Sequence, residues 1–143
     1  MIGDGIMIGG GGGSSTIELL GVACGSGSGQ TVVTMGSNSS VNVAYSNSEY
    51  FTHNGGVLTC VQGGTYKVYY WARGGRGSNA ERQCTWTLYK NSSSIGTGNA
   101  KLAGASGYYD VSFNTDDTVH ITCASVNTAG NGGYFTCGMA ITI

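Results

Sequence analysis

The chain has 143 residues, six basic and seven acidic side chains, and a formal net charge of −1. This balance excludes a basic surface for nucleic acid or an anionic membrane, and no apolar run approaches the roughly 20 residues of a membrane-spanning helix. There are 27 glycines and no proline, while Thr, Val, Tyr and Ser are plentiful and Leu, Lys and Glu are scarce. Such a composition favours strands joined by turns, and the length suits one domain with its own core.

Residues 1–16 form a distinct N-terminal segment that glycine makes too flexible to fold alone. Its apolar side chains, which would gain from burial against a partner, are Ile2, Ile6, Met7 and Ile8. We therefore predict an extended anchoring arm with a reach of roughly 50 Å, the alternative being a disordered start. The segment has neither the basic region nor the continuous apolar region of a signal peptide, so we expect synthesis in a reducing cytoplasm.

Residues 17–143 follow a pattern of strands and turns that predicts a head domain. The weaker candidate strands, with a flexible GSGSG spacer at residues 25–29, are residues 17–24, 31–35, 41–45, 50–53 and 58–62. Clear period-two alternation follows in residues 66–73, 83–90, 117–126 and 135–143. One apolar face per strand is typical of antiparallel sheets packed on a core, and many short strands indicate a sandwich or barrel.

The strand at residues 66–73 carries large aromatic side chains on both faces. Tyr66 and Tyr70 lie on one face, and Tyr69 and Trp71 lie on the other. A monomeric sandwich needs only one apolar face, so the second face is predicted to pack between subunits. A covering loop or plain surface exposure is the alternative.

The five cysteines are an odd number and show no C-x-x-C spacing, which excludes a complete intrachain disulfide framework and gives no support for zinc. Cys84, Cys123 and Cys137 fall in the apolar register of their strands, where a free cysteine behaves as a small apolar side chain. We favour buried thiols. In an exported protein, bridges among these three and Cys60 would be the alternative.

The order of motifs over residues 50–143 resembles the complement globular-head and tumour-necrosis-factor-like family. The first block, NGGVLTCVQGGTYKVYYW, matches the family pattern at Gly56, Leu58, Thr59, Cys60, Gly64, Tyr66 and Tyr70. The later blocks are TWTLYKNSSSI, GYYDVSFNTDDTVHITCAS and GYFTCGMAITI. The resemblance implies an antiparallel jelly-roll β-sandwich of ten strands that forms a homotrimer through one sheet face. The candidate interface residues are Tyr69, Trp71, Tyr66, Tyr70 and Phe135.

We expect no enzyme, because His53 and His120 are the only histidines and no G-x-S-x-G motif occurs. Calcium could use oxygen ligands from Asp110, Asp116 and Asp117, but their spacing forms no EF-hand and Asp in turns usually serves the backbone. No cofactor is therefore expected.

Ligand-facing candidates, whose rings or charges could contact a sugar, are Arg76, Arg82, Tyr108, Tyr109 and Tyr134. The alternatives are solvated arginines and tyrosines that pack across strands.

These features together suggest a bacteriophage virion surface protein made in the host cytoplasm. It would be a capsid decoration protein, a head fibre or a tail-fibre knob. The arm would dock on a capsid or tail protein, and the head would meet the medium or a host glycan, with no nucleic acid and no membrane insertion. An exported bacterial lectin-like module of the same fold is the alternative, and a hydrolase using His53 or His120 is a third hypothesis.

Overall fold

A computed structural model describes residues 19–28, 33–34, 48–75, 83–126 and 134–143. The described residues form ten strands: β1 (Leu19–Ser28), β2 (Val33–Thr34), β3 (Phe51–Asn54), β4 (Val57–Cys60), β5 (Gly64–Gly74), β6 (Cys84–Lys90), β7 (Ser93–Ala100), β8 (Ala105–Phe113), β9 (Thr118–Ser125) and β10 (Tyr134–Thr142). This part of the chain contains no helix long and apolar enough to cross a membrane.

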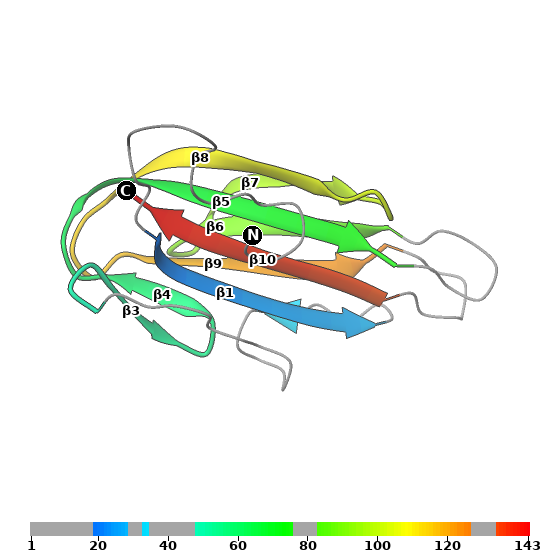
Figure 1. Cartoon of the computed structure of the whole chain (residues 1–143), viewed down its shortest axis with the longest axis horizontal. Helices are drawn as coiled ribbons and strands as arrows, with labels where there is room; N and C mark the ends of the chain where they lie inside the picture. The colour runs from blue at the N-terminus through cyan, green and yellow to red at the C-terminus, as the bar shows by residue number, and fades with distance from the viewer. Residues whose placement is uncertain (1–18, 29–32, 35–47, 76–82, 127–133) are drawn as a thin grey trace.

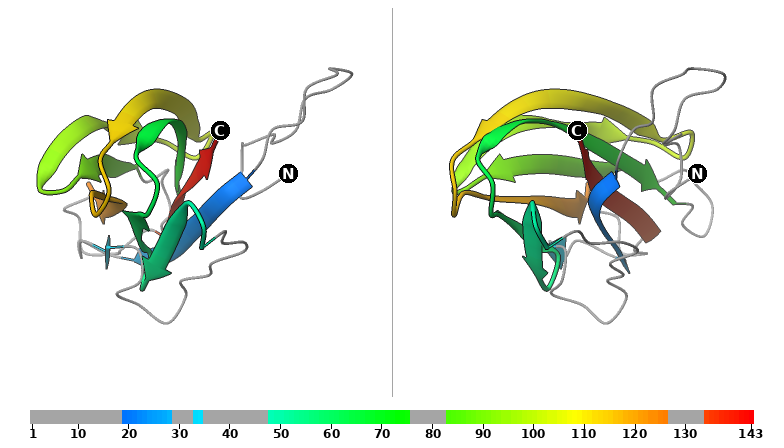
Figure 2. Two further views of the ribbon diagram at one scale, coloured as in Figure 1. Left: turned by 90° about the vertical axis from the view of Figure 1, so that its left-hand side faces the viewer. Right: turned by 60° about the vertical axis from the view of Figure 1, so that its left-hand side comes forward.

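The strands form two antiparallel sheets that face each other (Figure 2). Sheet A has the order β1-β10-β5-β8, and sheet B has the order β3-β4-β9-β6-β7, with β2 paired to β9. Most neighbours in a sheet are therefore distant in sequence, as a jelly roll requires, and the predicted all-β jelly-roll sandwich is confirmed.

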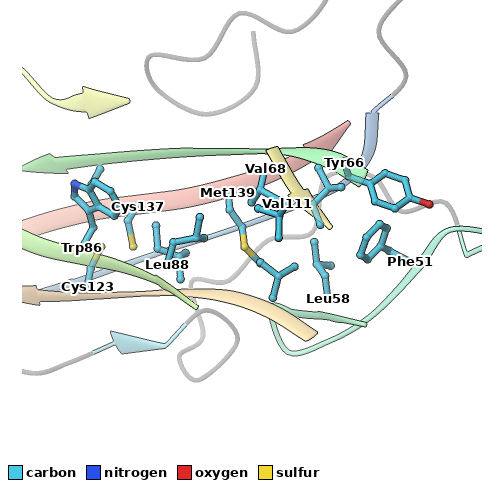
Figure 3. Packing of buried hydrophobic residues seen from close by; sticks show 14 of the residues in the cluster. Phe51, Leu58, Tyr66, Val68, Trp86, Leu88, Val111, Cys123, Cys137 and Met139 are labelled. Carbon is cyan, nitrogen blue, oxygen red and sulfur yellow. The ribbon is translucent and has the colours of Figure 1, made fainter. Parts of the chain in front are cut away.

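The inward faces of the two sheets make one apolar core, in the alternating pattern expected from the sequence (Figure 3). Val68 of β5, Leu88 of β6 and Ile121 of β9 have no exposed surface. At one end, the ring of Phe51 packs edge-on against Tyr66 and Phe113, at centroid distances of 5.0 and 5.5 Å. Burial of each large apolar side chain contributes about 1.5–3 kcal/mol, so this core is the main source of stability.

Several glycines leave space for an aromatic ring from a neighbouring strand or the facing sheet. The ring pairs are Trp71 over Gly138, Tyr70 over Gly107, Trp86 over Gly98 and Tyr109 over Gly96. A Cβ atom at Gly138 or Gly96 would overlap the ring, whereas one at Gly98 would lie 3.1 Å from the Trp86 indole. These four glycines therefore make room for aromatic side chains.

One sequence prediction about the strands is wrong, and one strand is absent from the predicted set. Residues 25–28, expected in a flexible spacer, continue β1 and pair with β10 as far as Ser28 opposite Tyr134. Strand β7 was not predicted, because its sequence SSIGTGNA consists mostly of residues typical of turns. The expected strand at residues 41–45 lies outside the described residues.

The start of β1 and the strand ends that flank residues 76–82 and 127–133 lie at opposite ends of the sandwich. Strand β1 begins at Leu19 opposite Thr142, near the end of β10. At the other end, Gly74 lies opposite Phe135, and the backbone N–H of Val126 donates to the carbonyl of Gln83 at 2.9 Å. The strand ends that flank residues 76–82 and 127–133 therefore lie away from the end where β1 begins (Figure 1).

Candidate interaction surface on sheet A

The outward face of sheet A carries an aromatic pair at the junction of β5 and β8. Tyr69 and Tyr108 are directly opposite each other in the register of the two strands. Their ring centroids are 5.5 Å apart, and Tyr108 is 53% exposed. Cross-strand aromatic pairs stabilise a sheet, but an exposed ring of this size also offers apolar area to another molecule.

The charges next to this pair compensate each other. The Lys67 ammonium donates to the Asp110 carboxylate at 3.0 Å and lies 4.5 Å from the centroid of the Tyr108 ring. The hydrogen bond to Asp110 raises the pKa of Lys67, so the ammonium keeps its charge at neutral pH. Both side chains are exposed, and solvent screening keeps their effect on stability small. The result is a nearly neutral surface around the two tyrosines.

The same face is buried where β5 meets β10. Trp71 is 3% exposed, and Ala140 and Thr142 have no exposed surface. Within the described residues, the hydroxyl oxygen of Thr142 has no hydrogen-bond partner. The indole of Trp71 lies over its cross-strand neighbour Gly138. This part of the face is therefore apolar and tightly packed.

Three of the predicted interface residues lie instead inside the sandwich, and the prediction is wrong for them. The Tyr66 hydroxyl donates to the Gln62 carbonyl at 2.6 Å while its ring packs in the core. Tyr70 stacks on Trp86 at a centroid distance of 3.9 Å, and Phe135 is 2% exposed. Side chains alternate along a strand, so Tyr69 and Trp71 are the aromatic residues that β5 directs outward. Trp71 is itself buried, so of the predicted interface residues only Tyr69 lies at the surface of the described chain.

The predicted ligand-facing residues are separated in the same way. Tyr108 is exposed on sheet A, whereas Tyr109 points inward and stacks on Tyr70 at 5.8 Å. Tyr134 begins β10, but nothing further of its side chain is described. The other predicted site residues lie outside the described residues: Arg76, Arg82, Ile2, Ile6, Met7 and Ile8.

The aspartates considered for calcium organise a turn and an ion pair. Asp116 adopts a positive φ of 75° between β8 and β9. The Asp117 carboxylate accepts from the backbone N–H of Asn114 at 2.8 Å and from the Asn91 amide at 3.1 Å. These hydrogen bonds lower the pKa of Asp117. No group of three or more potential metal ligands occurs among the described residues.

The two histidines lie on sheet B and have different surroundings. His53 is exposed on β3 opposite Leu58. His120 stacks on Tyr89 at 5.0 Å, and its buried Nδ1 has no hydrogen-bond partner in the described part of the chain. Burial lowers the pKa of His120, so its imidazole is neutral at pH 7. The ring therefore packs as part of the sheet surface.

No protein-family model and no curated protein sequence matches the chain. Solved structures do match. PRD1 vertex protein P5 is 10% identical, covers 88% of this chain and 99% of its own, and gives a TM-score of 0.55. The chain shares its jelly-roll fold with this vertex protein. GITRL from bushbaby is 15% identical, and the match covers 87% of this chain and 94% of GITRL with a TM-score of 0.45. The globular domain of zebrafish complement 1qA protein is 12% identical, and the match covers 84% of this chain and 94% of that domain with a TM-score of 0.47.

Proposed function

We propose that this chain is a non-enzymatic virion surface protein, a decoration protein or fibre knob, whose head assembles as a homotrimer. The supporting observation is the outward face of sheet A, where Tyr69 and the exposed Tyr108 form an aromatic pair whose neighbouring charges are paired. A neutral aromatic surface loses little by desolvation when a second copy covers it. The likeness in fold to a vertex protein supports the location on a particle.

The arrangement of the two ends supports attachment through residues 1–16. The segment that leads into β1 joins the sandwich at one end, and the ends that flank residues 76–82 and 127–133 lie at the other. An arm fastened to a capsid or tail protein would therefore turn those two loops toward the medium, where a host glycan could be bound. Three arms per trimer would increase the avidity for the particle by effective concentration.

The trimer is tested by sedimentation equilibrium of the full chain. We expect the wild type to sediment as a trimer. Tyr108→Glu, which adds an unpaired charge to the proposed interface, should sediment as a monomer. Thr97→Glu is the matched control, because Thr97 is exposed on β7 of sheet B, and this variant should remain trimeric. A monomeric wild type, or a trimeric Tyr108→Glu variant, would refute the interface.

The arm is tested by deletion of residues 2–13. Purified particles that lack the protein are mixed with the full chain or the shortened chain, and the bound fraction is measured after sedimentation. We expect the full chain to bind and the shortened chain, still trimeric, to stay in the supernatant. Equal binding of both chains would show that docking does not use the arm.

A further inference from the structure

Three buried thiols from both sheets meet in one place in the core. Cys84 of β6 and Cys123 of β9 belong to sheet B, and Cys137 of β10 belongs to sheet A. Each is at most 1% exposed, and all three are free thiols in the structure. Figure 3 shows Cys123 and Cys137 pointing toward each other from the two sheets beside Trp86.

Hydrogen bonds connect the three sulfur atoms through Cys123. This thiol is hydrogen-bonded to Cys137 and to Cys84. The bond with Cys137 is the main cause that raises the pKa of Cys123, and the bond with Cys123 lowers the pKa of Cys84. Cys123 is thus in contact with two candidate partners for covalent pairing.

The strand register distinguishes these two partners. Cys84 lies opposite Ser125, and Cys123 lies opposite Trp86, so the two cysteines are diagonal neighbours on adjacent strands. Diagonal Cα atoms are typically about 7–8 Å apart, beyond the range of about 4.4–6.8 Å that disulfides span. Cys137 belongs to the facing sheet, and its side chain points toward Cys123 across the core (Figure 3). The pair between the sheets is therefore the one that the diagonal register does not hold apart.

We propose that Cys123 and Cys137 are a disulfide site that links sheet A to sheet B once the protein meets a disulfide oxidant, while Cys84 stays reduced. In the reaction, the Cys137 and Cys123 thiols each lose a proton and together lose two electrons as the S–S bond forms. A small disulfide such as oxidised glutathione accepts both electrons and both protons and is released as two thiols. The site needs no other reactant.

The experiment is oxidative refolding followed by mapping of the cysteines. Reduced, denatured full-length chain is refolded with reduced and oxidised glutathione, then denatured, alkylated and cleaved with trypsin. The sequence places Cys123 and Cys137 together in the tryptic peptide 102–143 and Cys84 alone in peptide 83–90. We expect unalkylated peptide 102–143, lighter than its reduced form by two hydrogen atoms, and alkylated peptide 83–90.

Two variants make the result specific. Cys137→Ala should leave Cys123 without the predicted disulfide. Cys60→Ala is the matched control and should keep the disulfide, because the Cys60 thiol is also buried but donates to the Gln62 carbonyl at 3.1 Å. Peptide 102–143 alkylated at both cysteines in the wild type, or cross-linked to peptide 83–90 or any other peptide, would overturn the proposal.

Discussion

Replacement of Gly138 by alanine should destabilise the head through one identifiable contact. The new Cβ would overlap the six-membered ring of the Trp71 indole, a rigid group that cannot yield by bending. Overpacking of this kind costs about 1–3 kcal/mol, and alanine recovers about 0.5–1 kcal/mol of the backbone entropy that glycine loses on folding. We therefore expect the free energy of unfolding to fall by about 1 kcal/mol, and by about 2.5 kcal/mol at most.

The contact can be isolated by a double-mutant cycle. With Trp71 already replaced by alanine, the ring is gone, and Gly138→Ala should become neutral or slightly stabilising. Unfolding in urea is followed by circular dichroism at one protomer concentration, because the stability of an assembled protein depends on concentration. Gly98→Ala is the control, since its Cβ would lie 3.1 Å from Trp86 and require only a small shift. An equal loss for Gly138→Ala with and without Trp71 would refute the steric argument.

Three further predictions concern the core and pH. Leu88→Ala should lower the free energy of unfolding by about 2–5 kcal/mol in urea, and a loss below 1 kcal/mol would contradict full burial. Because the pKa of His120 is lowered in the folded protein, the unfolded chain binds the proton at a higher pH, and the free energy of unfolding should fall as the pH drops below about 6.5. His120→Gln should reduce this fall. The same dependence of stability on pH in the variant and the wild type would contradict the prediction. The lowered pKa of Asp117 stabilises the fold at neutral pH, and this contribution should be lost as the pH falls below about 4, whereas Asp117→Asn should lack it; thermal melts across this range provide the check.

Much of the fold could be predicted because alternation is strong in its central strands. Strands β6, β9 and β10 each have one apolar face, and the structure turns that face to the core. Strand β7 could not be recognised from the strand propensities of its residues. Gly96 and Gly98 occur there because the rings of Tyr109 and Trp86 occupy the space that a side chain would need. The residue pattern within one strand does not reveal which aromatic side chains of other strands pack against it.

The candidate surface could be predicted only in part, for a related reason. Alternation along residues 66–73 separates Tyr69 and Trp71 from Tyr66 and Tyr70, but it does not say which set faces inward. That choice depends on the facing sheet, where Trp86 stacks on Tyr70. The exposed partner Tyr108 was recognised as a candidate ligand-facing residue, while its position opposite Tyr69 depends on the pairing of β5 with β8.

The place of β10 in sheet A has a consequence for synthesis of the protein. This strand comes last among the described strands, yet it lies between β1 and β5 and pairs with both. Until residues 134–142 have left the ribosome, β1 has no partner in its sheet, and β5 has only β8. The head must therefore complete its folding after most of the chain is made, and its long-range pairings predict slow folding, in milliseconds to seconds. During that interval the edge of β5 that later pairs with β10 keeps its backbone N–H and C=O groups unpaired, which makes the nascent chain prone to aggregation before the last strand closes the sheet.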